Sequence, residues 1–300
     1  MTIVISPEQW RKGADLYEFR GHNVFMRKSG DWGRDTRVLV LLHGFPTASW
    51  DWNILWDAVA ARFRVLTADM LGFGYSAKPR NHEYSLLEQA DLFEDMLIAY
   101  GVHAYDILAH DYGSSVAQEL LARHEDRLRE GMPGPVLRSV VFLNGGLFPE
   151  AHRARRLQTL LQGRFGWLVS MLMTKRSFSQ GFSEIFGPET QPDEAEIDAF
   201  WELLRYNGGR FVFHRLIAYI GERMQQRDRW VEAMRTSAVP LRFVNGLADP
   251  VSGAHMVARY RELIPDADIV ELDGIGHYPQ IEAPAEVLEA CHQFWEKVRI

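Results

Sequence analysis

Short apolar runs alternate with helix-periodic segments along the first half of the chain. Nearly continuous apolar runs of four or five residues are typical of strands buried on both faces of a sheet. Such strands are predicted at 38–42, 64–68, 106–109 and 139–143. Helical spacing of apolar residues predicts helices at 49–63, 84–100 and 114–124. Strands that alternate with helices in this way predict a doubly wound, mostly parallel sheet of the α/β class.

The start of the helix predicted at 84–100 carries a capping signal. Ser85 is a favoured N-cap residue, and Glu88 follows three positions later. In a capping box, two such side chains satisfy free N–H groups at the start of a helix. We therefore expect Ser85 and Glu88 to cap this helix together.

The pattern changes in the middle of the chain. Between residues 145 and 235 there is no strand pattern, and helical stretches are separated by glycines and a Gly-Pro pair. The α/β alternation then resumes, with strands and helices predicted at 241–245, 255–263, 269–272 and from Pro284 onward. The simplest organisation is one α/β core, residues 1–145 and 236–300, that carries an inserted all-helical cap at 146–235.

Composition places the chain among ordinary globular proteins. The 300 residues are 47% hydrophobic and 24% charged, which excludes wholesale disorder. The net charge of −7 and the pI near 5.9 argue against nucleic acid as a partner. No apolar run has transmembrane length, and the first residues lack a signal-peptide pattern, so we expect a cytoplasmic location. The single cysteine, Cys291, excludes an internal disulfide and fits a reducing compartment.

Charge is divided unevenly within the predicted cap. Residues 151–176 contain six basic side chains and no acid, whereas residues 177–204 contain seven acids and no base. A basic segment that also carries Leu, Phe and Trp is suited to a membrane surface. The alternative is that the two segments pack together and neutralise each other, and this pairing is the arrangement that we favour.

The segment Asp106–Leu120, DILAHDYGSSVAQEL, carries the main chemical signal. A predicted strand stops, a tight turn follows, and a helix begins. The small residues Ala109 and Gly113 lie two positions before and after Asp111. This is the small-x-nucleophile-x-small pattern of a nucleophile elbow, which presents its middle side chain at the carboxyl edge of a sheet. The sequence therefore predicts Asp111 as a nucleophile.

A second register of the same motif is possible. Gly113 and Ala117 flank Ser115 in the same way, and that register would make the protein a serine esterase. We favour Asp111, because it follows the predicted strand almost directly, as the motif requires.

Two partners for Asp111 follow in the chain, each beyond the end of a predicted strand. Asp249 follows the strand at 241–245, and His277 follows the strand at 269–272. The carboxyl ends of the strands are where α/β sheets bind ligands. The order nucleophile, acid, histidine is the order of a hydrolase triad on such a sheet.

The loop after the first long strand is predicted to bind a developing oxyanion. His43, Gly44, Phe45 and Pro46 form this loop, and Pro46 fixes it because proline has no N–H to donate. The backbone N–H groups of Phe45 and Tyr112 are the two predicted donors. No histidines have metal-ligand spacing, so we expect neither a metal nor a cofactor.

These residues resemble the α/β-hydrolase family, and within it the epoxide hydrolase and haloalkane dehalogenase branch that uses an aspartate nucleophile. The resemblance rests on HGFP (43–46), ADMLGFGYSAKP (68–79), HDYG (110–113), LADP (247–250) and GHYPQIEAP (276–284). The chain is also similar to the mesoderm-specific transcript protein family, through HGFPTASWDW, HDYGSSVAQELL, NGGLFPEAHR and HYPQIE.

The resemblance implies an aspartyl-ester mechanism. Asp111 would displace at a saturated carbon, His277 would activate water against the ester, and Asp249 would orient the imidazole. For an epoxide, which opens to a vicinal diol, the resemblance implies a cap tyrosine as the acid. Tyr219 is the preferred candidate and Tyr206 the alternative. The expected partners are water and a small, mostly apolar substrate.

Other functions stay open at this point. One alternative is a haloalkane or haloacid dehalogenase. The residues that hold the halide in that branch are replaced here by Tyr112 and Phe45. A serine esterase would use Ser115. A non-catalytic binding protein on the same scaffold is the fourth possibility, and the sequence does not specify an oligomeric state.

Overall fold

An eight-stranded sheet forms the centre of the molecule, and the predicted α/β-hydrolase fold is confirmed. The computed structural model describes residues 5–30 and 37–298. The strands lie in the order β1-β2-β4-β3-β5-β6-β7-β8. Their bounds are Asp15–Phe19 (β1), His22–Lys28 (β2), Val38–Leu42 (β3), Arg64–Ala68 (β4), Ala104–His110 (β5), Val136–Leu143 (β6), Leu241–Gly246 (β7) and Ile269–Leu272 (β8).

Strands β3 to β8 are parallel to one another, which confirms the predicted mostly parallel sheet. β3 pairs in parallel with both β4 and β5, and β5, β6, β7 and β8 follow in parallel register. The hairpin of β1 and β2 is antiparallel and extends the sheet beyond β4. The apolar-run pattern does not predict this hairpin, because β1 is mostly exposed and only the centre of β2 is buried.

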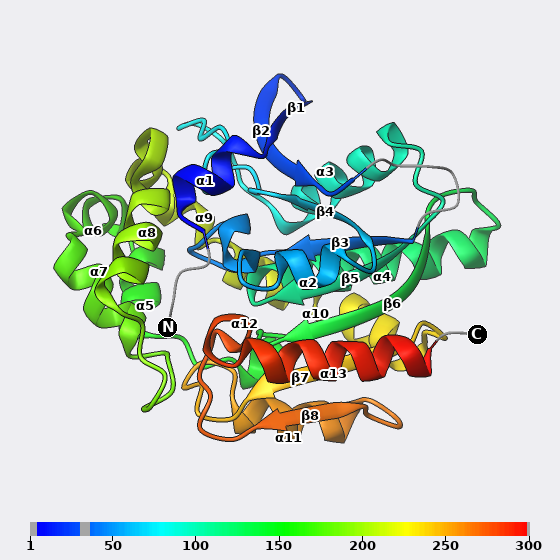
Figure 1. The fold of residues 1–300 in the computed structure, drawn as a ribbon. Helices are drawn as coiled ribbons and strands as arrows, with labels where there is room; N and C mark the ends of the chain where they lie inside the picture. The colour runs from blue at the N-terminus through cyan, green and yellow to red at the C-terminus, as the bar shows by residue number, and fades with distance from the viewer. Residues whose placement is uncertain (1–4, 31–36, 299–300) are drawn as a thin grey trace.

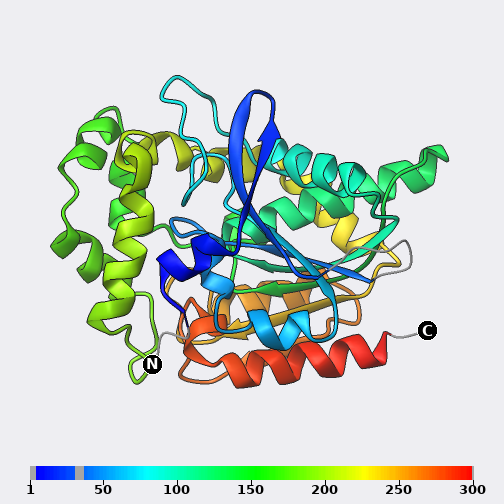
Figure 2. The same ribbon diagram turned by 45° about the horizontal axis from the view of Figure 1, so that its top comes forward.

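Helices cover both faces of the sheet. In Figures 1 and 2, α2 and α13 lie on one face, and α3, α4 and α10 lie on the other. The core helices are α1 (Pro7–Lys12), α2 (Trp56–Ala60), α3 (Leu86–Ala99), α4 (Tyr112–Glu130), α11 (Ala254–Leu263), α12 (Pro279–Glu282) and α13 (Pro284–Lys297), with the short 3₁₀ turn η1 (Ser49–Trp52). None of the helices in the described ranges is long and apolar enough to cross a membrane.

The helix predicted at 84–100 is α3, but its cap differs from the prediction. Ser85 is the N-cap and accepts a hydrogen bond from the N–H of Leu87. Glu88 is not the second half of a capping box, because its carboxylate bonds to His82 instead. The carboxylate of Glu222 takes its place and accepts the N–H of Leu86 at 2.7 Å. A distant residue has replaced the local partner that the sequence predicts.

The segment between β6 and β7 contains helices and turns only, as predicted for the inserted cap. Its elements are η2 (Pro149–Ala151), α5 (Arg156–Gln162), α6 (Gly166–Leu172), α7 (Lys175–Ser183), α8 (Glu194–Arg205), η3 (Tyr206–Phe211), α9 (Phe213–Leu216) and α10 (Tyr219–Thr236). Helices α5 to α8 form a lobe at the left of Figure 1. The last helix, α10, packs along α4 of the core, so the predicted boundary at residue 235 lies within a helix of the core layer.

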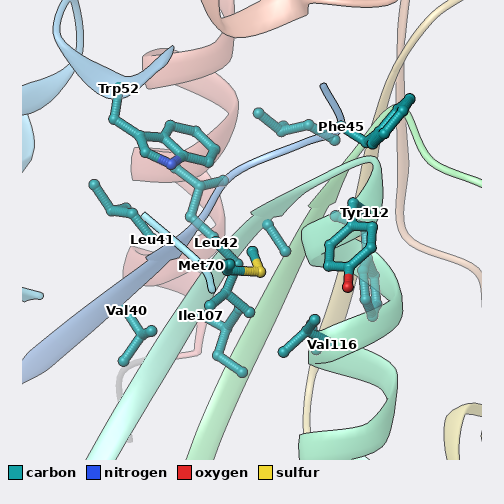
Figure 3. Packing of buried hydrophobic residues seen from close by; sticks show 14 of the residues in the cluster. Val40, Leu41, Leu42, Phe45, Trp52, Met70, Ile107, Tyr112 and Val116 are labelled. Atoms are coloured by element: carbon teal, nitrogen blue, oxygen red, sulfur yellow. The ribbon is translucent and has the colours of Figure 1, made fainter. Parts of the chain in front are cut away.

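The strands that carry the site are buried on both faces. All five residues of β3 are buried, and Figure 3 shows Leu42 of β3, Ile107 of β5 and Val116 of α4 packed in one cluster. Tyr112 and Phe45 lie at the end of this cluster where β3 and β5 stop. Burying a side chain of this size contributes about 1.5–3 kcal/mol, so this packing holds the strand ends in a fixed position.

Candidate active site

Asp111 lies in the sharp turn between β5 and α4. Its backbone has φ 44° and ψ −103°, outside the regions that a residue with a side chain normally adopts. β5 ends at His110. α4 begins at Tyr112, two residues before the predicted start of this helix. A Cβ on Gly113 would lie 2.3 Å from the carbonyl oxygen of Leu42. The close approach of helix and strand therefore requires glycine at this flank, as the elbow pattern implies.

The structure brings Asp111, His277 and Asp249 together. His277 Nδ1 lies 2.7 Å from Asp249 Oδ2, and His277 Nε2 lies 3.9 Å from Asp111 Oδ1. Each of the three residues is only 3% exposed. The imidazole thus lies between two carboxylates that are separated by 138 residues in the chain.

Asp249 is held by a dense set of donors. Its carboxylate accepts hydrogen bonds from Asn144 Nδ2 at 2.9 Å and from the N–H groups of Val251 and Ser252 at 2.7 and 3.0 Å. Burial opposes its charge, but His277 and these donors outweigh burial and lower the pKa of Asp249. Asp249 is therefore ionised and orients the imidazole.

The charge of His277 is stabilised by its neighbours. Burial disfavours the imidazolium, but the carboxylates of Asp249 and Asp111 outweigh burial and raise the pKa of His277 to about 9. The backbone carbonyl of His277 accepts a hydrogen bond from His110 Nε2 at 2.8 Å. His277 is therefore mostly a cation at pH 7 while Asp111 is ionised.

The loop after β3 lies directly against Asp111. The N–H of Phe45 donates to Asp111 Oδ2 at 3.1 Å. Tyr112 is the first residue of α4, where backbone N–H groups have no partner within the helix. His43 accepts the N–H of Met70 through Nε2 at 3.0 Å. A Cβ on Gly44 would lie 2.6 Å from His110 Nδ1, so only glycine fits there.

A buried arginine, which the sequence does not indicate, completes the surroundings of Asp111. Arg223 Nη2 donates to the backbone carbonyl of Asp111 at 3.0 Å and lies 3.5 Å from its Oδ1. Burial raises the pKa of Asp111, but Arg223 and His277 together lower it below its usual value. Arg223 lies on α10, where it looks like one of many surface charges in the sequence. Only the packing of α10 on α4 brings it to the elbow.

The alternative nucleophile Ser115 is not placed to react with His277. Ser115 is fully buried, and its hydroxyl accepts a hydrogen bond from Arg223 Nε at 2.6 Å. The residue that faces His277 is Asp111. The geometry therefore favours the aspartate register of the elbow over the serine register.

The two candidate tyrosines lie in different places. The ring of Tyr219 lies 5.1 Å from the ring of Tyr112 and 5.5 Å from the ring of Phe45. The hydroxyl of Tyr219 accepts a hydrogen bond from Gln158 Nε2 at 3.5 Å. Tyr206 follows the end of α8, and its ring contacts lie outside the site.

Tyr206 packs instead near the N-terminus of the chain. Its ring lies 4.8 Å from the ring of Tyr75, and Arg11 and Lys78 lie over its faces. These contacts favour Tyr219 over Tyr206 as the acid, and the choice between the two tyrosines stays a prediction.

A cavity of about 830 Å³ opens between the cap and the elbow. Asp111, His277 and Pro46 line its core side, and Gln158 lines its cap side. Its other walls are mostly apolar and come from Phe45, Leu157, Leu161, Phe178, Phe182, Ile185, Phe213 and Val251. Arg153, Arg155 and Glu184 are the charged residues of the lining besides the site itself. Within the described ranges no group of three or more His, Cys, Asp or Glu side chains is arranged as metal ligands.

The fold and the elbow-based triad define the class of protein: this chain belongs to the alpha/beta hydrolase family, whose model matches residues 39–290. It is 38% identical to the mouse mesoderm-specific transcript protein over 292 residues, covering 95% of this chain and 86% of the relative. It is 41% identical to the putative hydrolase LipZ of Mycobacterium tuberculosis over 286 residues, covering 95% of this chain and 96% of the relative.

Solved structures share the fold at low sequence identity. The epoxide hydrolase CorEH matches with a TM-score of 0.75 and 18% identity, covering 95% of this chain and 99% of its own. A loop variant of the haloalkane dehalogenase DbeA from Bradyrhizobium elkanii also matches with a TM-score of 0.75 and 18% identity, covering 95% and 96%. At this level of identity, the likeness extends to the fold alone.

Proposed function

We propose that this hydrolase opens a largely apolar epoxide through an ester on Asp111 and releases a vicinal diol. The observation that carries the proposal is the placement of the Asp111 carboxylate, which lies between the N–H of Phe45 and the imidazole of His277. A carboxylate needs no base to become a nucleophile, and it suits displacement at a saturated carbon.

The two oxygens of Asp111 have different surroundings, which assigns a role to each. Oδ2 accepts the N–H of Phe45 and becomes the carbonyl oxygen of the ester. Oδ1 attacks the epoxide carbon, the carbon–oxygen bond of the ring breaks, and the electron pair moves to the departing oxygen. In the second step, water adds to the ester carbon, and the developing charge on Oδ2 is stabilised by the N–H groups of Phe45 and Tyr112.

Formation of the ester turns His277 into a base. The pKa of His277 is near 9 partly because Asp111 is negative. Once Asp111 is a neutral ester, this attraction is lost and the pKa of His277 falls. The imidazolium therefore releases its proton to solvent, which in turn reprotonates the acid of the first step. The neutral imidazole accepts a proton from the attacking water, and Asp249 stabilises the cation that forms. When the bond between the ester carbon and the diol oxygen breaks, the imidazolium returns this proton to the diol, and Asp111 is again a carboxylate.

Tyr219 is the proposed proton donor for the departing oxygen. Its hydroxyl is paired with the amide of Gln158, which lines the cavity. Burial and the nearby Asp111 raise the pKa of Tyr219, so the phenol keeps its proton until a strong base develops beside it. The alkoxide of an opening epoxide is such a base.

Halide displacement is the second candidate reaction. The same ester chemistry would serve it, but the side chains of Phe45 and Tyr112 offer no N–H donor to a halide. We therefore prefer the epoxide as substrate.

The experiment that tests the proposal is intact-mass spectrometry of the His277→Gln variant after exposure to a panel of epoxides and haloalkanes. We expect one adduct with the mass of the epoxide, mapped to Asp111, because the ester forms but is not hydrolysed. Asp111→Asn in the same background is the control and should form no adduct. An adduct with haloalkanes only would assign the dehalogenase, and labelling of Ser115 by a fluorophosphonate would assign the esterase.

The absence of both adducts and wild-type turnover would assign a non-catalytic binding protein.

Tyr219→Phe tests the acid separately, and Tyr206→Phe is its matched control. We expect about a 10²-fold or greater loss of epoxide opening in Tyr219→Phe alone. An equal rate in the two variants would remove Tyr219 from the mechanism.

A further inference from the structure

The outer surface of the cap carries an unusual concentration of exposed apolar side chains. Thirteen large hydrophobic residues are exposed in the described ranges, and six of them fall between residues 160 and 172. These six residues, called the α5–α6 patch from here on, are Leu160, Phe165, Trp167, Leu168, Met171 and Leu172. Clusters of this kind mark interaction sites far more often than isolated exposed residues do.

Helix α6 has the reverse of the usual amphipathic arrangement. Gly166 and Ser170, one turn apart, are its buried residues, whereas Trp167 and Leu172 are 48% and 68% exposed. The contact that buries Ser170 is specific, because its hydroxyl donates to the carbonyl of Arg210. A soluble helix normally buries its large apolar face. Helix α6 is therefore fixed with that face turned outward.

Basic side chains flank the patch in the sequence. The predicted pairing of the two charged cap segments occurs in part, since Arg155 pairs with Glu184, and Lys175 pairs with Asp198. Arg164 and Arg176 make no ion pair with any acid of the described chain, and residues 151–176 contain no acid at all. The segment that carries the patch is therefore cationic, and its charge is only partly neutralised.

We propose that the α5–α6 patch docks on an anionic lipid bilayer. An outward apolar face with Trp and Phe, carried by a basic segment, is typical of a helix that lies at the headgroup level of a bilayer. Figure 1 places α6 at the outer edge of the lobe, away from the sheet. The net charge of −7 lies mostly on the rest of the molecule, which orients the cap toward a negative surface.

The patch and the cavity share helix α5. Leu157 and Leu161 of α5 line the cavity, and the exposed Leu160 of the same helix belongs to the patch. Helix α5 thus contributes side chains both to the patch and to the cavity that holds Asp111. Resting on the proposed function, this arrangement would shorten the path of an apolar epoxide from a bilayer to the nucleophile.

Sedimentation with lipid vesicles tests the docking without any turnover assay, so its failure and that of the proposed function are distinguishable. The full chain is spun with vesicles of phosphatidylcholine containing phosphatidylserine, and with phosphatidylcholine alone, at low and high salt. We expect binding to the anionic vesicles at low salt that weakens as salt screens the charges.

Two variants locate the contact. We expect the double substitution Trp167→Ser, Leu172→Ser to weaken the vesicle partition coefficient about tenfold or more. Arg164→Gln with Arg176→Gln should weaken it about tenfold on anionic vesicles only. The matched control is Ile98→Ser with Leu128→Ser, since these side chains on α3 and α4 are 66% and 62% exposed. Thermal unfolding of each variant shows that the fold is kept.

Three results would overturn the proposal. The first is no binding of the wild-type chain to anionic vesicles at low salt. The second is an equal loss of binding in the control variant. The third is a dimer, seen by light scattering without vesicle binding, that Trp167→Ser, Leu172→Ser dissociates. That outcome would assign the patch to a second copy of this chain.

Discussion

At the scale of single residues, the site depends on keeping Asp111 ionised while it is buried and held in a strained backbone conformation. Burial alone would favour the neutral acid. Arg223 opposes that effect from α10, and it also bonds the backbone carbonyl of the strained residue. One buried side chain therefore supports both the charge and the geometry of Asp111, the proposed nucleophile.

Replacing Arg223 by glutamine should raise the pKa of Asp111, because less positive charge then opposes burial. We expect ester formation to slow by about 10- to 100-fold and the acid limb of its pH profile to move to higher pH. Ester formation is followed by rapid-quench mass spectrometry in the His277→Gln background. The control is Arg227→Gln, which changes a partly exposed arginine one turn further along α10 that pairs with Glu150. A slower reaction with an unmoved acid limb would show a structural role only.

Removing the negative charge of Asp249 should lower the pKa of His277 from about 9. In the wild type, the folded pKa lies above the value of about 6.5 in the unfolded chain. The stabilisation from the imidazolium is therefore complete below about pH 6.5 and is lost as the pH rises through 9. Between about pH 6.5 and 9, the free energy of unfolding should therefore fall less in Asp249→Asn than in the wild type.

NMR titration of the His277 imidazole, together with urea unfolding at several pH values, measures both effects. His255, whose ring bonds the carbonyl of Val251 outside the triad, is an internal control in the same spectra. An unchanged pKa of His277 in Asp249→Asn would contradict the assignment of Asp249 as its charge partner.

At the scale of elements, helices that are distant in the chain complete one another. The N-terminus of α3 receives its carboxylate from Glu222 of α10, and Ser85 donates its hydroxyl to the same carboxylate at 2.6 Å. The local capping box predicted with Glu88 would have stabilised α3 alone. The observed cap couples α3 to α10, the helix that also carries Arg223.

Truncating Glu222 to alanine should destabilise the protein by about 1–2 kcal/mol, since the N–H of Leu86 loses its acceptor and the N–H of Leu87 keeps only Ser85. The matched substitution Glu88→Ala removes a partly exposed pair with His82 and should cost less than about 1 kcal/mol. Urea unfolding of both variants measures the difference. A larger loss of unfolding free energy in Glu88→Ala than in Glu222→Ala would contradict this and would support the predicted capping box.

At the scale of the whole molecule, a single carboxylate ties the cap to the histidine loop. Glu282 Oε2 accepts the N–H groups of Gly187 in the cap and Gly276 before the histidine, both at 2.8 Å. Its other oxygen accepts the N–H of Tyr278 at 2.8 Å. The N–H of His277 itself donates to the carbonyl of Ile185. The position of the imidazole thus depends on the docked cap.

The substitution Glu282→Gln keeps one acceptor oxygen and replaces the other by a donor, so at least one of these N–H groups loses its partner. We expect faster hydrogen exchange at Gly187 and slower hydrolysis of the Asp111 ester, with about a tenfold lower kcat. Glu289→Gln on the exposed face of α13 is the control. Unchanged exchange at Gly187 would show that the cap is held without Glu282.

Much of the fold and of the candidate site is predictable from local patterns. Continuous apolar runs predict the parallel strands, because a strand buried on both faces has no room for polar side chains. The elbow around Asp111, and the positions of Asp249 and His277 after their strands, follow from short motifs with fixed backbone geometry. The β1–β2 hairpin lacks such a pattern and is missed.

The sequence by itself determined the α/β class, the all-helical insertion, and the three side chains that meet at the carboxyl edge of the sheet. The tertiary structure decided which carboxylate caps α3, which tyrosine approaches the nucleophile, and that Arg223 supports Asp111. It also decided that the apolar side of α6 faces outward. These features depend on contacts between residues far apart in the chain, and the spacing of neighbouring residues carries no information about such contacts.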